Sequence, residues 1–164
     1  MTSNGIGRKA NLKIWIDADA APREVKEIIF RAAKRLGIDA VLVSNQRLLP
    51  PAGNTFVSAV LVEGGPDVAD QHIVTVAQPG DVVVTQDIPL AALLVPKQIA
   101  VIDPRGEEHT EKTIGARLSV RDFMTSLRSA NIITSGPAPF DVKAREAFAS
   151  SLDRVLTRLL RAQK

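Results

Sequence analysis

Five aspartates follow predicted strands or open the next helix: Asp17, Asp19, Asp67, Asp70 and Asp87. The carboxyl ends of parallel strands meet at one sheet edge, where open α/β sheets bind their ligands. Two like charges about 4 Å apart repel by roughly 4 kcal/mol at an effective dielectric of 20. A bound Mg²⁺ or Mn²⁺ relieves that repulsion, because hard cations take oxygen ligands. The sequence therefore predicts a metal site, with Asp17, Asp67 and Asp87 as catalytic ligands and the other two assisting.

Four of these aspartates also have a local structural explanation, whereas Asp17, which closes the central strand, needs a partner. Asp19 is placed to cap the helix that Pro22 opens, and Asp87 is placed to cap the helix after it. Asp67 and Asp70 lie in the first turn of a predicted helix, where the helix dipole favours negative charge. Their joint placement at three strand ends is what favours a shared metal site over four separate local roles.

Several other polar residues are predicted to contact substrate. Asn45 follows the second strand, and Thr85 lies two residues before Asp87 in the chain. Arg105 is a candidate phosphate contact, although a type I turn explains its segment equally well. Arg117 and Arg121 lie four residues apart on a predicted helix. They are interpreted either as a stripe that binds phosphates or as part of a solvated helix face.

The hydrophobic pattern predicts the elements that would position these residues. Strands are expected at 12–16, 40–43, 56–62, 82–84 and 99–102. Helices are expected from Pro22 to Leu36, at 67–77, at 89–95 and, in the C-terminal third, at about 114–130 and 142–162. Almost continuous apolar strands alternating with helices indicate a three-layer α/β fold, with a mainly parallel five-stranded sheet and two C-terminal helices. We expect a flexible tail at 1–11 and a single domain at 12–164.

Composition narrows the classes of function. A chain of 164 residues is suited to one domain, and the absence of cysteine excludes disulfides and thiolate metal sites. Aromatic residues make up only 4%, which weighs against recognition by aromatic base stacking. The net charge of +3 permits nucleic-acid binding without establishing it. No apolar run approaches the roughly 20 residues that span a bilayer, so we expect a cytoplasmic protein without a membrane partner.

Short segments along 12–160 form a specific pattern: DADAAP at 17–22, DVAD at 67–70, GDVVVTQDIPLA at 80–91, PRG at 104–106, RLSVRDFM at 117–124 and GPAPF at 136–140. Together they resemble the YaiI/YqxD family of bacterial proteins. One departure is Ala21, where that family commonly has cysteine. The resemblance implies a PIN-like domain, a group of metal-dependent ribonucleases, and would carry metal coordination onto the five aspartates.

Three functions stay open at this point. The first is a Mg²⁺- or Mn²⁺-dependent nuclease that cleaves RNA phosphodiesters through a metal-bound water. The second is a regulatory module that binds a metal or a nucleotide without turnover. The third is a phosphatase of the haloacid-dehalogenase type, with Asp17 as nucleophile and Asp19 as acid/base. Ala21 and the absence of lysine between Lys34 and Lys97 disfavour the third. The sequence predicts neither the oligomeric state nor the biological pathway.

Overall fold

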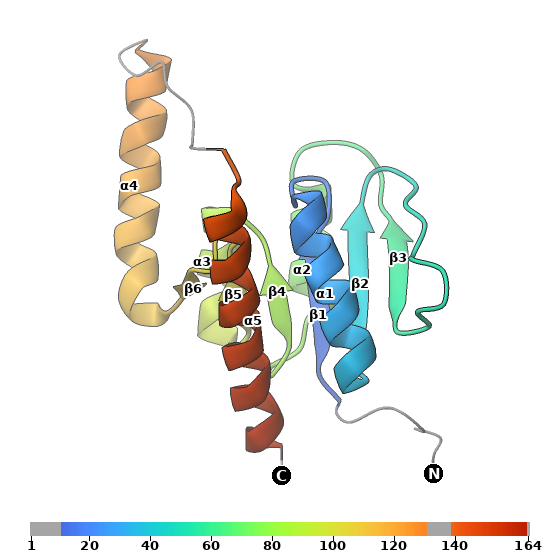
Figure 1. Ribbon diagram of the computed structural model, residues 1–164. Coiled ribbons are helices and arrows are strands. Elements are labelled where there is room, and N and C mark those ends of the chain that lie inside the picture. The colour runs from blue at the N-terminus through green and yellow to red at the C-terminus, as the bar shows by residue number, and fades with distance from the viewer. Residues whose placement is uncertain (1–10, 131–138, 164) are drawn as a thin grey trace.

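The computed structural model describes residues 11–130 and 139–163 (Figure 1). Within these ranges the chain forms one sheet of six strands: β1 (Lys13–Asp17), β2 (Asp39–Ser44), β3 (Val57–Leu61), β4 (Val82–Val84), β5 (Ala100–Ile102) and β6 (Glu108–His109). The strand order is β3-β2-β1-β4-β5-β6, and only β6 runs antiparallel to its neighbour. The central position therefore belongs to β1, between β2 and β4.

Helices cover both faces of this sheet: α1 (Arg23–Leu36), α2 (Val68–Val76), α3 (Ile88–Leu94), the short 3₁₀ helix η1 (Val95–Lys97), α4 (Glu111–Ser129) and α5 (Val142–Ala162). The helices α1 and α5 pack on one face, and α2 and α3 pack on the other (Figure 1). The outer helix α4 contacts α3 and contains no buried residue. No helix within the described ranges combines the length and apolar character that crossing a bilayer requires.

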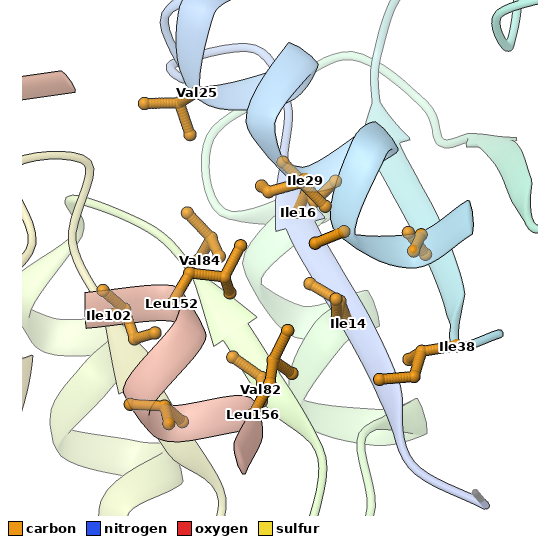
Figure 2. Packing of buried hydrophobic residues seen from close by; sticks show 14 of the residues in the cluster. Ile14, Ile16, Val25, Ile29, Ile38, Val82, Val84, Ile102, Leu152 and Leu156 are labelled. Atoms are coloured by element: carbon orange, nitrogen blue, oxygen red, sulfur yellow. The ribbon is translucent and has the colours of Figure 1, made fainter. Parts of the chain in front are cut away.

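The alternation of side chains along β1 explains why its three middle residues, Ile14, Trp15 and Ile16, are all apolar. Ile14 and Ile16 point into the core beneath α1 and α5, whereas Trp15 points into the core beneath α2 and α3. Figure 2 shows Ile16 beside Ile29 of α1, and Leu152 and Leu156 of α5 beside Val84 and Val82 of β4. A strand buried on both faces needs an apolar residue at every position, which is typical of parallel sheets.

These observations confirm the predicted α/β class and all five predicted strands. The structure adds β6, a strand of two residues that is too short to show a hydrophobic period. It also begins α4 at Glu111, because Thr110 caps this helix and exchanges hydrogen bonds with Thr113. The predicted tail at 1–11 lies outside the described residues except for Asn11.

A buried carboxylate joins the starts of β1 and β4. Asp81 is only 3% exposed, and its Oδ1 accepts a hydrogen bond from the Lys13 backbone N–H at 3.0 Å. Its Oδ2 accepts from the Trp15 indole Nε1 at 3.0 Å and from the Gln78 backbone N–H at 2.9 Å. Asp81 thus satisfies three donors at the sheet edge opposite the candidate site.

Asp81→Ala is expected to lower the free energy of unfolding by about 2–4 kcal/mol, because it leaves buried donors without an acceptor. Urea denaturation measures this loss. In a Trp15→Phe background, which lacks the indole donor, the same substitution should cost measurably less. Equal losses in the two backgrounds, or a loss under about 0.5 kcal/mol, would contradict the proposed linkage.

Candidate functional site

Asp17, Thr85 and Asp87 are linked where β1 and β4 end. The Thr85 hydroxyl donates a hydrogen bond to Asp17 Oδ2 at 2.9 Å and accepts one from the Asp87 backbone N–H at 3.0 Å. Thr85 itself is buried, at 2% exposed. Because β1 and β4 are adjacent and parallel, the residues that come after them meet at one edge, as the sequence predicted.

Asp87 also caps the helix that begins after it. Its Oδ1 accepts a hydrogen bond from the Leu90 backbone N–H at 2.9 Å, with Pro89 in the first turn of α3. The alternative interpretation, in which Asp87 caps this helix, is therefore correct. Capping does not remove Asp87 from the edge, since the same carboxylate lies within hydrogen-bonding reach of Asp70.

Asp19 is turned toward β2. Its Oδ1 accepts a hydrogen bond from the Ser44 hydroxyl at 2.6 Å, and its Oδ2 accepts from the Asn45 backbone N–H at 3.0 Å. The alternative in which Asp19 caps α1 is wrong, because Pro22 is the N-cap residue and no side chain caps that end. Asp19 instead fixes the turn after β2. It thereby places Asn45 at the acidic edge, which is the sheet edge that carries Asp17, Asp19, Asp67, Asp70 and Asp87.

Asp67 and Asp70 bring α2 to the same edge. Asp67 is the N-cap residue of α2, with a left-handed backbone at φ 64° and no capping hydrogen bond from its side chain. Left-handed backbone outside glycine stores strain of about 1–3 kcal/mol, which aspartate tolerates better than most residues. Asp70, one turn further along, faces Asp87 and lies within electrostatic range of Asp17 and Asp67.

Two of the acids at this edge, Asp17 and Asp70, have a raised pKa. Burial raises the pKa of Asp17, the Thr85 hydroxyl lowers it in part, and the charges of Asp87 and Asp19 raise it further. Burial, the hydrogen bond with Asp87 and the neighbouring carboxylates together raise the pKa of Asp70 to about 7. Asp70 is therefore partly protonated near neutral pH, where a free aspartate is fully ionised.

Asp70→Asn is expected to make the stability of the protein less dependent on pH. Below about pH 4 Asp70 is protonated in both the folded and the unfolded chain. As the pH rises toward 7 the unfolded chain ionises freely, so the wild type loses stability that Asp70→Asn keeps. We expect the difference to reach about 1 kcal/mol at pH 8, because solvent screens a partly buried side chain. Urea unfolding at pH 4 and pH 8 in metal-free buffer tests this, and a pH-independent difference would refute it.

The acidic edge has the ligand types that a hard divalent cation prefers, but its side chains are not arranged to hold one. Its donors are carboxylate and hydroxyl oxygens, the ligands that Mg²⁺ and Mn²⁺ prefer. Across residues 11–130 and 139–163, however, no three aspartate, glutamate or histidine side chains stand close enough to hold a metal ion. Binding would therefore require rotation of side chains such as Asp70, which is only partly buried.

The three predicted arginines lie in the turn after β5 and on α4. Arg105 is exposed in the turn after β5, where the Gly106 N–H bonds to the Asp103 carbonyl at 2.9 Å, as the turn alternative required. This turn is at the same sheet edge as the acids, because β5 is parallel to β4. Arg117 pairs with Glu107 at 2.6 Å, and Arg121 pairs with Asp122 at 3.1 Å. Both α4 arginines thus have the partners expected of a solvated helix face.

Two positioning residues were missed by the sequence analysis. Ser44 is 1% exposed and joins Asp19 to the backbone N–H of Gln46, from which its hydroxyl accepts a hydrogen bond at 2.9 Å. The Gln86 side chain donates to the Ala20 carbonyl at 3.1 Å and ties the loop after β4 to the loop after β1. A hydroxyl that ends an otherwise apolar strand was the available signal for Ser44.

Comparison with known proteins gives a consistent assignment. The family model described as "Uncharacterized BCR, YaiI/YqxD family" matches residues 15–158. A UPF0178 protein of Myxococcus xanthus is 52% identical over 152 residues, covering 93% of this chain and 99% of the relative. UPF0178 proteins of Trichlorobacter lovleyi, 52% identical over 153 residues, and Aliivibrio fischeri, 49% identical over 148 residues, cover at least 90% of this chain and 98% of their own. No solved structure matches the chain.

Proposed function

The chain belongs to the YaiI/YqxD family, whose description assigns no activity, and we propose that it is a divalent-metal-dependent nuclease acting on RNA. One observation carries the proposal. Asp17, Asp70 and Asp87 come from distant stretches of sequence and gather at one sheet edge, where burial, the hydrogen bond with Asp87 and the neighbouring carboxylates raise the pKa of Asp70 to about 7. Carboxylates held together at such a cost favour a bound cation.

Asp17, Asp70 and Asp87 would hold the cation, with Asp19 and Asp67 at its flanks. When bound, such a cation supplies Lewis-acid activation of water and of the phosphodiester. The hydroxyl of Thr85 keeps Asp17 in one orientation, and the hydroxyl of Ser44 does the same for Asp19. Two buried hydroxyls thereby pre-position carboxylates that otherwise repel one another.

The RNA backbone would approach from the side of the turn after β5. Arg105 lies at that turn, on the acidic edge of the sheet. Arg117 is held beside the same turn by Glu107, and Arg121 comes one helical turn later on α4. These cations would attract phosphates without entering the acidic group itself. Asn45, placed by Asp19, would contact the nucleotide from the side of β2.

The phosphatase alternative fits the geometry less well. A haloacid-dehalogenase-type reaction would need Asp19 free to exchange protons beside Asp17. Both oxygens of Asp19 instead accept hydrogen bonds, from Ser44 and from the Asn45 backbone. The regulatory module remains the stronger competitor, because it needs the same acidic edge but no turnover.

Two measurements on the purified protein separate these functions. Calorimetric titration with MnCl₂ tests for cation binding, and incubation with single-stranded, hairpin and nicked RNA in Mn²⁺ tests for cleavage. Binding together with cleavage that EDTA abolishes supports the nuclease. Binding without cleavage of any substrate favours the regulatory module, and the absence of both removes the metal site altogether.

A further inference from the structure

A cavity of about 400 Å³ lies between α2 and α3 and opens beside the acidic edge. Its walls are aliphatic: Val74 comes from α2, and Leu90 and Leu93 come from α3. Its rim is polar and includes Asp67, Asp70 and Gln71. The volume falls in the range of about 300–1,000 Å³ that small-molecule sites occupy.

The apolar wall of this α2–α3 cavity is left open to solvent. Leu90 is buried at its base, but Leu93 is 59% exposed although it belongs to a short helix that packs on the core. Of the polar groups, the Thr75 hydroxyl is already committed to the Gln71 carbonyl at 2.8 Å. The Asp67 carboxylate makes no capping hydrogen bond and is exposed at the rim.

The charges of the residues that line the cavity exclude a phosphate and favour a ligand that carries hydrogen-bond donors. The charged residues that line the cavity within the described ranges are two aspartates, and none of its lining residues is basic. An occupant complementary to this lining has a flat or compact apolar body and hydrogen-bond donors at its edge. An exocyclic amino group meets that need, because carboxylate acceptors pair with the amino group of a base.

The α2–α3 cavity adjoins the acidic edge. Asp70 lines the cavity and also faces Asp87, so the two sites share one side chain. Asp87 caps the helix α3 that supplies Leu90 and Leu93. A nucleotide whose base enters the cavity would therefore have its backbone next to the acids.

We propose that the α2–α3 cavity binds an amino-bearing nucleobase of single-stranded RNA. The aliphatic walls cover the faces of the ring, and Asp67 accepts hydrogen bonds from its exocyclic amino group. Single-stranded RNA presents unstacked bases whose edges are free for such pairing. The inference rests on the proposed function for its choice of ligand, and it adds a preference for cytosine, adenine or guanine over uracil.

Cytidine and uridine are the matched probes, because position 4 is amino in the first and carbonyl in the second, and N3 changes with it from an acceptor to an N–H donor. Neither carries a phosphate, so binding can be measured in EDTA without the metal. Titration followed by ¹H–¹⁵N NMR should show shifts in α2 and α3, with cytidine binding about 10-fold more tightly than uridine. Asp67→Asn, which suits the left-handed backbone, should reduce that ratio to about 2-fold or less.

The walls are tested by a pair of equally exposed leucines. Leu93→Ala should weaken cytidine binding about 5-fold, because it removes part of the apolar wall. Leu61→Ala is the control, since Leu61 is 56% exposed on β3 and does not line the cavity. Both variants remove an exposed side chain, so both are expected to fold.

Equal affinities for cytidine and uridine, or shifts that avoid α2 and α3, overturn the inference. Shifts produced in the cavity by spermidine but by neither nucleoside also overturn it, because they would assign the site to an aliphatic cation. Failure here is distinct from failure of the proposed function. Metal-dependent cleavage of RNA without base preference would leave the nuclease intact and remove only this base site.

Discussion

Asp17→Asn is expected to reduce Mn²⁺-dependent RNA cleavage by about 100- to 1,000-fold while the protein stays folded. Asp17 ends the central strand and lies between the acids contributed by the loops and helices around it. Loss of one charged group that stabilises a phosphoryl transition state removes an effect of that size. Asparagine keeps an oxygen that accepts from Thr85, and burial already raises the pKa of Asp17, so folding should not suffer.

The control is Asp153→Asn, the same change of carboxylate to amide on α5. Asp153 is 69% exposed and pairs loosely with Arg35 at 3.8 Å, on the outer face of the helix pair. Its cleavage rate should stay within about 2-fold of the wild type, because surface pairs contribute little. Circular dichroism and Tm establish that both variants are folded. If folded Asp17→Asn cleaves as fast as Asp153→Asn, the acidic edge is not the catalytic site.

Phe148→Ala is expected to lower the free energy of unfolding by about 3–5 kcal/mol, the loss typical of a fully buried phenylalanine. Phe148 is 0% exposed and fills the core between α5 and the sheet. The turn after β5 packs against α5 at the same position. A Cβ at Gly106, where φ is 94°, would lie 2.6 Å from the Ala147 carbonyl oxygen. Little room exists for the helix to move inward and close the cavity that the alanine leaves.

Phe123→Ala provides the matched comparison, since Phe123 is 63% exposed on α4. Its substitution should change stability by no more than about 0.5 kcal/mol. Guanidinium denaturation of both variants gives the two values under identical conditions. Similar losses for Phe148 and Phe123 would mean that α5 does not complete the core as described.

Much of the candidate site was predictable because a parallel sheet makes position along the chain a guide to position in space. Asp17 and Asp87 lie at the ends of two buried strands, and adjacent parallel strands bring the residues at their carboxyl ends to one edge. The strands themselves were predictable because burial on both faces requires continuous apolar runs. This reasoning needs only the sequence of each element and the handedness of the connections.

The remainder depended on contacts that sequence does not encode locally. Asp19 could cap a helix or bind across the sheet, and the choice depended on Ser44, which lies 25 residues away. Asp67 takes a left-handed backbone that aspartate permits without requiring it. Arg117 and Arg121 have a spacing that fits both a phosphate stripe and a solvated face, and only their partners Glu107 and Asp122 distinguish the two.

The strand order has a consequence for synthesis on the ribosome. The strands β1, β2 and β3 are synthesised first and can pair with one another. The edge of β1 that pairs with β4 stays unpaired until β4 has been synthesised. Thr85, which bonds to Asp17, follows it by 68 residues in the chain. At elongation rates of about 5–20 residues per second that interval lasts roughly 3–14 s, during which an apolar strand edge is unpaired. The nascent chain therefore passes through a window in which chaperone binding or aggregation competes with completion of the acidic edge.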